Sequence, residues 1–431
     1  MSEPTNSLPL STDSPDLAPF FAKLDAARAA SLELGSATTQ QKNEALVEVA
    51  HTLRAHVPEI IEANQRDIDA GRASGLTDAL LDRLALTAPR IEALAVAVLE
   101  IVGLPDPVGD VVRGSTLPNG VQIAQLRVPF GVVGAIYEAR PNVTVDIAAL
   151  ALKSGNAAVL RGGSAALNSN QILVSLIQQA IAQHGIPAAS VQSIDEFGRA
   201  GARALMQARG QVDVLIPRGS AALINTVVTE SKVPVIETGA GVVHIVLDET
   251  APVQWSVDIV HNAKTQRPSV CNTVETLLVL AAAADRVLPA VGAKLTKSGV
   301  TIHADERAIA LLPDAVPATE EDWSTEYLSL DLSVRIVDTL DEAIDHIRRY
   351  STKHTESIIT NDLGNAEYFL NRVDSATVMV NTSTRFSDGG EFGFGAEVGI
   401  STQKLHARGP MGLQELTSTK WIVRGNGQSR A

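Results

Sequence analysis

The sequence predicts an α/β protein with two domains, each built around a parallel β-sheet, and a small β arm. Three observations lead to this fold class. Residues 17–102 have helical periodicity, residues 131–236 alternate between short apolar runs and helical stretches, and a similar alternation resumes between 251 and 408. A chain of 431 residues with 45% hydrophobic content is long enough and apolar enough for two or three cores.

The chain begins with a polar segment and continues as helices. Residues 1–16 are rich in Ser, Thr, Pro and Asp and lack a basic region followed by an apolar core, so we expect a disordered lead-in and no secretory signal. Beyond it, apolar residues such as Leu46, Val49 and Leu53 lie three or four positions apart, which is typical of amphipathic helices.

A hairpin and a late strand interrupt the domains. Residues 111–127 alternate around the turn sequence Pro118-Asn-Gly120, which favours a β-hairpin, and Lys420 to Arg424 has the composition of a strand. We predict that 111–127 and 412–431 are oligomerisation arms and that the protein is a homo-oligomer, a dimer or higher.

The alternating series predicts βαβ units and hence a parallel sheet, whose ligands bind at the carboxyl ends of the strands. We therefore assign a cofactor-binding domain to 17–110 and 128–250. Its expected strands and helices are, in order, 131–137, 144–153, 157–160, 164–183, 191–194, 199–209, 212–216, 220–231 and 233–236.

A second α/β domain, 251–411, is expected to be catalytic because it contains the single cysteine of the chain, Cys271. Its clearest expected elements are a helix at 253–264, a strand at 274–280, a helix at 340–350 and a strand at 377–380.

Composition excludes several classes of protein. A net charge of −14 argues against a nucleic-acid binder, one cysteine excludes an intramolecular disulfide, and no Cys/His cluster has the spacing of a metal site. The longest apolar runs fall short of the roughly 20 residues that span a bilayer. We expect a cytoplasmic protein without a membrane segment.

Cys271 lies in the polar, cationic segment Lys264-Thr-Gln-Arg267-Pro-Ser-Val-Cys271. Neighbouring positive charges favour the thiolate, which is the nucleophilic form. The alternative is a small buried hydrophobic residue, which is the usual role of a cysteine outside disulfides.

Two strand ends in the first domain are followed by an arginine, glycine and serine at a helix start. They are Arg161-Gly-Gly-Ser164 and Arg218-Gly219-Ser220. Backbone N–H groups at a helix N-terminus bind anions, so the pair indicates a nucleotide phosphate site, although Gly and Ser are also ordinary turn and cap residues. Neither loop has the dinucleotide fingerprint GxGxxG.

A third loop, Glu138-Ala-Arg140-Pro-Asn142-Val-Thr144, connects a buried strand to a helix. Asn142 or Thr144 could cap that helix. Alternatively, the neutral Asn142 amide could donate a hydrogen bond to a developing oxyanion without changing the pKa of a nearby thiol.

These residues, in this order, resemble the aldehyde dehydrogenase superfamily. Longer strings resemble its branch that reduces L-glutamyl 5-phosphate in proline biosynthesis, and the resemblance covers about 20–421. The strings begin at Glu138, Asn262, Cys271, His303 and Ser401, the last reading Ser-Thr-Gln-Lys-Leu-His-Ala-Arg-Gly-Pro-Met-Gly. The resemblance implies an aldehyde-dehydrogenase-like fold of two Rossmann-like parallel-sheet domains with a small β oligomerisation arm. It also implies reduction of the acyl phosphate by NADPH, with glutamate 5-kinase as a candidate pathway partner.

The resemblance also assigns roles by position. It places Cys271 as the nucleophile that forms a thioester and Asn142 as the oxyanion donor. Arg161, Gly219, Ser220 and Glu326 fall on cofactor-binding positions.

The charges of residues near the assigned positions predict the cofactor and the groups that bind substrate. Ser164 stands where relatives that prefer NAD often have a carboxylate, and with Arg161 and Arg218 nearby we expect NADPH over NADH. Five cations are expected to hold the substrate or the departing phosphate: Arg140, Lys264, Arg267, Arg385 and Arg408.

Three other functions remain open on the sequence. A hydrolytic NAD(P)-dependent aldehyde dehydrogenase would use Glu237 as its base, and a cysteine hydrolase would pair Cys271 with His244 or His261. A non-catalytic nucleotide-binding protein would not need Cys271 at all.

Overall fold

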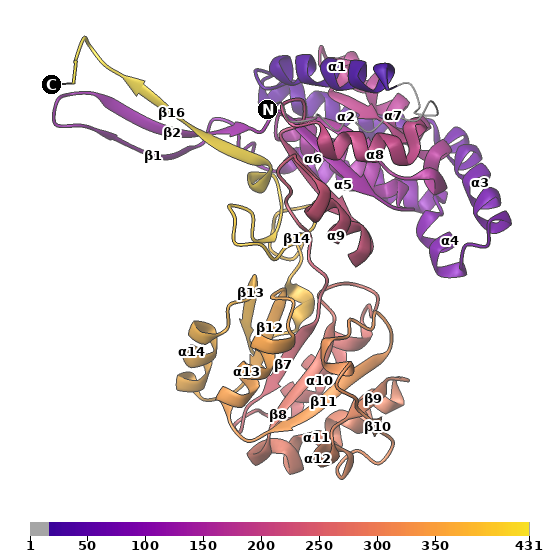
Figure 1. Cartoon of the computed structure of the whole chain (residues 1–431), viewed down its shortest axis with the longest axis vertical. Coiled ribbons are helices and arrows are strands. Elements are labelled where there is room, and N and C mark those ends of the chain that lie inside the picture. The colour runs from indigo at the N-terminus through magenta and orange to yellow at the C-terminus, as the bar shows by residue number, and fades with distance from the viewer. Residues whose placement is uncertain (1–16, 431) are drawn as a thin grey trace, which may run out of the picture. The chain divides into compact units, whose positions relative to one another are not determined.

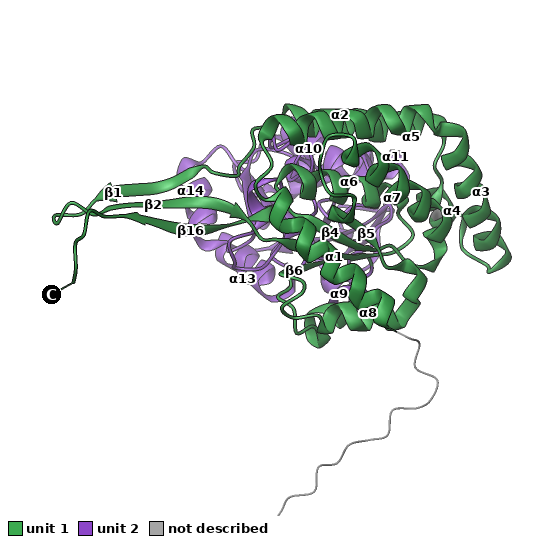
Figure 2. Ribbon diagram, turned by 90° about the horizontal axis from the view of Figure 1, so that it is seen from above, with its two compact units in different colours: residues 1–219, 226–235, 416–431 green, residues 220–225, 236–415 purple. Residues whose placement is uncertain are grey.

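The computed structural model describes residues 17–430 and divides into two compact units (Figure 2). Unit 1 comprises the described residues up to 219, with 226–235 and 416–430, and unit 2 comprises 220–225 and 236–415. The lead-in predicted for 1–16 lies outside the described residues.

The N-terminal part of unit 1 is helical, as the periodicity predicted. Thr38 begins the second helix with a capping box in which its side chain and that of Gln41 satisfy each other's backbone N–H groups. This helix buries Leu46, Val49 and Leu53 on one face. The five helices are α1 (Ala18–Leu34), α2 (Thr39–Ala55), α3 (Val57–Ala73), α4 (Asp78–Leu84) and α5 (Ala88–Gly103).

The first sheet is parallel and has the order β5-β4-β3-β6. Its central strand β3 is buried along its whole length. The strands are β3 (Val132–Tyr137), β4 (Ala157–Arg161), β5 (Val191–Ser193) and β6 (Val214–Arg218). The helices that follow them are α6 (Pro141–Lys153), α7 (Leu167–Ala182), α8 (Gly198–Gln207) and α9 (Ala221–Glu230). The strand predicted at 233–236 is reduced to one parallel bridge between Leu215 and Val235.

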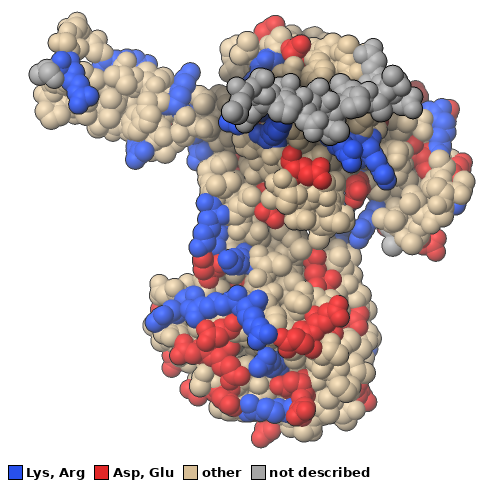
Figure 3. All heavy atoms as spheres, in the orientation of Figure 1, with Lys and Arg blue, Asp and Glu red and all other residues tan. Residues whose placement is uncertain are grey.

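A three-stranded antiparallel arm extends from this unit (Figure 1). It consists of β1 (Val111–Thr116), β2 (Gln122–Pro129) and β16 (Thr417–Arg424), and the hairpin turn uses Gly120 at φ +87°. Both predicted β segments are confirmed. Basic side chains appear on the arm without acidic ones (Figure 3). Residues 111–129 and 417–430 contain five basic residues and no acidic one: Arg113, Arg127, Lys420, Arg424 and Arg430.

Unit 2 contains a seven-stranded parallel sheet of order β10-β9-β11-β8-β7-β12-β13. Its strands are β7 (Val243–Leu247), β8 (Val274–Leu280), β9 (Thr301–Ala304), β10 (Val316–Pro317), β11 (Asp331–Val337), β12 (Thr355–Ile359) and β13 (Thr377–Val380). Its helices are α10 (Val253–Thr265), α11 (Ala281–Lys297), α12 (Glu306–Ile309), α13 (Leu340–Tyr350) and α14 (Leu363–Arg372). A short antiparallel pair, β14 (Ile400–Ser401) and β15 (Gly409–Pro410), completes the unit.

The boundary between the units differs from the predicted one. The sequence predicts it at 250/251, whereas the long segment of unit 2 already begins at Ile236. The reason is β7, a short apolar strand that hydrogen-bonds with β8 and β12 of the second sheet. A buried strand of this kind does not reveal from its own residues which sheet it joins.

Candidate active site

The carboxyl edge of the first sheet brings three predicted loops together. Arg161, the last residue of β4, lies opposite Ile136 of β3, and Arg218, the last residue of β6, lies opposite Tyr137. The two arginines therefore end strands on either side of β3, as expected for a ligand site at this edge.

The loop after β4 does not offer the free N–H groups that we predicted. Gly162 and Gly163 donate their N–H groups to Asp195 Oδ1 at 2.6 and 3.2 Å. The Asp195 carboxylate also accepts from the Asn170 amide at 2.8 Å, and burial raises the pKa of Asp195. The two N–H groups that we predicted for a phosphate are thus used by an internal carboxylate.

The helix after this loop is also capped internally. Ser164 begins a short 3₁₀ turn, and α7 starts only at Leu167. The N–H groups of Asn168 and Ser169 donate to the Asp67 carboxylate at 3.1 and 2.8 Å. The backbone N–H groups at this helix start are therefore used within the protein, and the cofactor role of Ser164 stays a prediction. What remains for a ligand is the exposed Ser164 and Arg161, whose buried Nε has no hydrogen-bond partner among the described residues.

The loop after β6 is more open. Arg218 is half-buried, and Gly219 and Ser220 are exposed. Ser220 Oγ accepts a hydrogen bond from the Leu223 N–H at 3.3 Å, which is the ordinary capping role left open by the sequence. Its hydroxyl proton is not used by that bond.

The first turn of α6 places the Asn142 side chain next to Asp146. Arg140 is the residue before α6 and makes no side-chain cap, and Asn142 donates through Nδ2 to Asp146 Oδ2 at 3.2 Å. Burial raises the pKa of Asp146 to about 6. Thr144 is buried and bonds the Tyr137 hydroxyl at 2.6 Å. Neither Asn142 nor Thr144 caps the helix, so that alternative is wrong.

Cys271 lies in the loop between α10 and β8 and is half-buried. Hydrogen bonds within the loop and to a distant segment hold it in place: Thr273 Oγ1 donates to the Arg267 carbonyl at 2.8 Å, and the Asn272 amide donates to the Ser387 carbonyl at 2.9 Å. A partly exposed thiol on an ordered loop contradicts the alternative of a buried hydrophobic residue.

Two of the predicted cations lie at this loop. Arg267 belongs to it and is exposed, and the half-buried Arg385 donates through Nε to Gln266 Oε1 at 2.7 Å. Burial lowers the pKa of Arg385, and Asp388, Arg267 and Cys271 all lie within electrostatic reach of its guanidinium. Positive charge next to Cys271 favours its thiolate.

Two other predicted cations are already paired. Lys264 is fully buried, and its ammonium lies 2.6 Å from Glu275 Oε2, so the prediction that it binds substrate is contradicted by its burial. Arg408 donates to the Asp374 carboxylate at 2.8 Å, and Lys404 pairs with the other oxygen of the same group. Lys404 and Arg408 lower the pKa of Asp374 to about 2.

The backbone beside Cys271 is supported by Gly241. A Cβ atom built on Gly241 would lie 1.5 Å from the Cys271 carbonyl oxygen, so only glycine fits there. The Gly241 N–H donates to Glu326 Oε1 at 2.6 Å. Burial raises the pKa of Glu326, whose predicted role was to bind cofactor.

The groups required by the alternative functions are engaged elsewhere. Glu237 Oε2 accepts from the Gln403 amide at 3.3 Å. His244 is fully buried against Glu356, with Nδ1 at 3.2 Å from the carboxylate, and His261 Nε2 bonds Ser298 Oγ at 2.8 Å. Neither histidine is arranged as the base of a cysteine hydrolase.

Sequence reasoning missed four residues that shape the site: Asp146, Asp195, Gly241 and Glu275. Asp146 follows Asn142 by one helical turn, and Glu275 is an acid in an apolar strand, so both carried a detectable signal. The partners of Asp195 and Gly241 are distant in sequence and only the fold brings them close.

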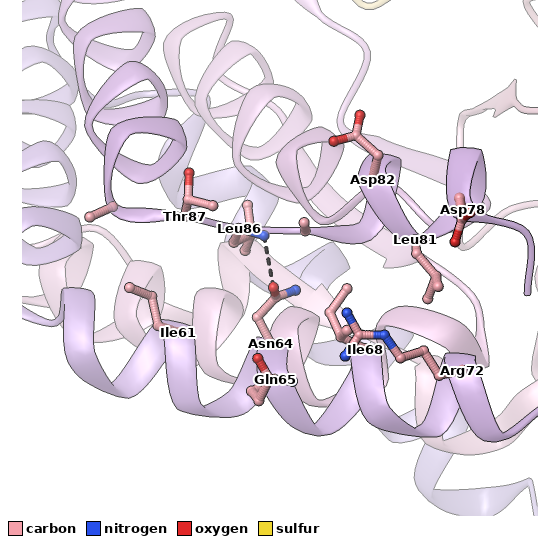
Figure 4. Close-up of a pocket in the computed structure, with 12 residues that line it drawn as sticks. Ile61, Asn64, Gln65, Ile68, Arg72, Asp78, Leu81, Asp82, Leu86 and Thr87 are labelled. Carbon is pink, nitrogen blue, oxygen red and sulfur yellow. Dashed lines mark hydrogen bonds between the residues drawn. The ribbon is translucent and has the colours of Figure 1, made fainter.

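A surface pocket of about 500 Å³ lies along α3 and α4 in unit 1 (Figure 4). Asn64, which is buried at its base, donates to the Leu84 carbonyl and the Ser169 hydroxyl and accepts from the Leu86 N–H. Its polar atoms are satisfied within the protein, so we assign no ligand to this pocket.

Within residues 17–430, no cluster of three or more His, Cys, Asp or Glu side chains is placed to bind a metal ion. Across the same residues, every helix is too short or too polar to cross a bilayer.

Each unit contains a parallel sheet; the first unit has an arginine at the end of β4 and of β6, and the second has a thiol on a cationic loop. The family model described as the aldehyde dehydrogenase family matches residues 18–310, and the chain therefore belongs to that family. Membership implies use of a nicotinamide cofactor, NAD(P).

Individual relatives narrow the branch to the gamma-glutamyl phosphate reductases. The chain is 68% identical to the gamma-glutamyl phosphate reductase of Leifsonia xyli over 95% of this chain and 97% of the relative. It is 64% identical to that of Clavibacter michiganensis over 94% of each. The crystal structure of gamma-glutamyl phosphate reductase from Thermotoga maritima matches with a TM-score of 0.93 at 46% identity, covering 95% of this chain and 99% of that one. An acetylating aldehyde dehydrogenase from Geobacillus thermoglucosidasius shares the fold, with a TM-score of 0.69 at 18% identity over 96% of this chain and 98% of that one.

Proposed function

We propose that the protein reduces L-glutamyl 5-phosphate with NADPH to L-glutamate 5-semialdehyde and phosphate, through a thioester on Cys271, as a step of proline biosynthesis. The observation that carries the proposal is the half-buried Cys271 on an ordered loop beside Arg267 and Arg385, in a chain 68% identical to a gamma-glutamyl phosphate reductase.

The first chemical step forms a C–S bond and breaks a C–O bond. The Cys271 thiolate attacks the acyl carbon, and the bonding pair to oxygen leaves with the phosphate. Asn142 donates an amide hydrogen bond to the oxyanion, and such a donor contributes on the order of 10²–10³ in rate. Arg140, Arg267 and Arg385 are the cations that we assign to the substrate and the departing phosphate.

The second step returns the enzyme to its starting state. NADPH, when bound, supplies the hydride that reduces the thioester carbon. The C–S bond then breaks, the carbonyl forms again as an aldehyde, and Cys271 regains its thiolate. Because phosphate is the leaving group, this direction needs no base to activate water, which leaves Glu237 without a required role.

The residues at the first sheet edge fit a phosphorylated nucleotide. Arg161 has a buried Nε without a hydrogen-bond partner among the described residues, and the loop after β6 adds Arg218, Gly219 and Ser220. With Ser164 in place of a carboxylate, this charge pattern favours a 2′-phosphate, so we assign NADPH. Glu326 is retained for the nicotinamide ribose, through the oxygen that does not accept from Gly241.

The assembly that we propose is a homo-oligomer joined through the arm. The arm exposes Val111, Trp421 and Val423 by 64%, 49% and 63% and carries only basic charge, whereas the chain as a whole has a net charge of −14. Glutamate 5-kinase remains a candidate pathway partner.

The decisive test is NADP⁺ reduction by glutamate semialdehyde and phosphate, followed at 340 nm in the parent and in Cys271→Ser. We expect turnover that requires phosphate in the parent and none in the variant. A hydrolytic aldehyde dehydrogenase would instead turn over without phosphate and lose activity in Glu237→Gln. No absorbance change from the parent would refute the reductase assignment.

A further inference from the structure

Three consecutive residues, 326–328, contact two supports of the Cys271 loop: Gly241 and the Lys264–Glu275 ion pair. Glu326 Oε1 accepts the Gly241 N–H at 2.6 Å, and the Tyr327 ring centroid lies 5.8 Å from Lys264 Nζ. The Leu328 N–H donates to Glu275 Oε1 at 3.3 Å. Leu328 adopts φ +55°, a strained left-handed conformation for a residue with a branched side chain.

The second of these supports is an ion pair that joins the two ends of the loop. Lys264 lies in the last turn of α10, before the loop, and Glu275 lies in β8, after it. The Lys264 ammonium donates to Glu275 Oε2 at 2.6 Å and to the Val274 carbonyl at 3.1 Å, and both charged side chains are fully buried. Cys271 lies between these anchors in the sequence.

Gly241 is the first support and lies outside the loop. Its Cα approaches the Cys271 carbonyl so closely that no larger residue fits, and its N–H is held by Glu326. A shift of the Glu326 side chain would therefore move Gly241, and with it the Cys271 backbone that packs against Gly241.

Tyr327 is fixed in turn. Its hydroxyl bonds the Asp322 carboxylate at 2.7 Å and the Ser333 hydroxyl at 2.8 Å. The strained backbone at Leu328 persists because the residues before it are anchored in this way.

We propose that Glu326-Tyr327-Leu328, together with the Lys264–Glu275 ion pair, is a clamp that positions the Cys271 loop for attack on substrate. The inference rests on the proposed function for the identity of the nucleophile. Tyr327, Lys264 and Glu275 act here as positioning residues, because they hold the loop and do not contact the reacting atoms.

A purely structural role for the ion pair predicts a different outcome from a positioning role. Loss of general packing would lower the melting temperature without changing the turnover of the enzyme that stays folded. Loss of positioning would lower kcat in folded enzyme, because a small misplacement of a reacting group costs rate more than binding.

The test compares Glu275→Gln with Arg348→Met, which breaks the exposed Arg348–Asp345 pair on α13. We measure kcat, KM for NADP⁺, melting temperature and the rate at which iodoacetamide alkylates Cys271 in the native enzyme. For Glu275→Gln we expect kcat to fall about tenfold or more with KM within about twofold, and alkylation to become a few-fold faster as the loop loosens. The control should match the parent in all four.

A folded Glu275→Gln enzyme with parental kcat and alkylation rate would overturn the clamp. If that variant does not fold, Tyr327→Phe replaces it, because it keeps the ring and loses only the bonds to Asp322 and Ser333. For Tyr327→Phe we expect kcat to fall about threefold or more with parental KM, and parental kcat would overturn the proposal. Alkylation needs no turnover, so an inactive parent would refute the proposed function while the alkylation rates still test the clamp.

Discussion

The side-chain amide of Asn142 donates a hydrogen bond to the Asp146 carboxylate at 3.2 Å, one turn further along α6. One amide hydrogen is thereby fixed within the helix, and the second is left for another acceptor. The same contact lowers the pKa of Asp146, whereas burial raises it more strongly, to about 6. The oriented Asn142 amide leads to a prediction for activity, and the raised pKa of Asp146 leads to a prediction for stability.

Asn142→Ala should lower kcat/KM by about 10² to 10³, because it removes a donor to the oxyanion of the attack step. The rate of Cys271 alkylation as a function of pH should stay parental, since a neutral amide does not change the charge around the thiol. Steady-state kinetics and iodoacetamide labelling measure the two effects.

Gln254→Ala is a matched control. Gln254 lies in the first turn of a helix and also donates to an aspartate one turn later, Asp258. A loss below threefold in Asn142→Ala would contradict the oxyanion role.

Asp146→Asn should stabilise the protein near neutral pH. The folded-state pKa of Asp146 is raised to about 6 from 3.8, so the folded protein binds this proton more tightly than the unfolded chain does. Stability from this group therefore falls as pH rises from about 4 to about 6, and the cost, about 1–3 kcal/mol, is fully present above that range. The difference in melting temperature between variant and parent, measured from pH 4.5 to 7, should grow with pH in favour of the variant. A constant difference would contradict the raised pKa.

Much of the fold could be predicted because its elements have strong local signals. The helices of 17–102, the Pro118-Asn-Gly120 hairpin and the alternation of 131–231 all follow from local periodicity and turn chemistry, and each is present. The domain boundary could not be read in this way. β7 is an apolar strand like its neighbours, and only its register with β8 and β12 assigns it to the second sheet.

The sequence predicted which types of residue form the candidate site. It did not predict which other residues those side chains and backbone groups bind. Arg161 and Arg218 do flank β3, because parallel strands end at one edge. The N–H groups of Gly162 and Gly163 look available in the sequence, but Asp195, distant along the chain, accepts both. The same holds for Lys264. The sequence shows that it is charged, whereas its burial against Glu275 depends on tertiary structure and could not be predicted.

Arg218→Ser should change cofactor preference. Removing a charge-assisted hydrogen bond to a 2′-phosphate costs about 1.5–3 kcal/mol, so we expect KM for NADPH to rise about 10- to 100-fold while KM for NADH stays within twofold. Initial rates with each cofactor at saturating substrate give the comparison. An equal rise in both KM values would place Arg218 away from the 2′-phosphate, and comparable kcat/KM for both cofactors in the parent would contradict the assignment of NADPH itself.

Gly241→Ala should nearly abolish turnover while the rest of the protein stays folded. The new Cβ would lie 1.5 Å from the Cys271 carbonyl oxygen, so the Cys271 backbone or the Gly241 segment has to move, and the hydrogen bond to Glu326 moves with it. A displacement of about 1 Å at a reacting group costs on the order of 10² in rate, which sets the minimum loss of kcat that we expect.

Gly103→Ala provides the control, because that exposed glycine has nothing within 4 Å of its added Cβ and ends helix α5. Rate measurements and thermal melting on the two variants separate the effects: Gly103→Ala should keep parental kcat, and a Gly241→Ala enzyme within tenfold of the parent would show that the support under Cys271 is not required.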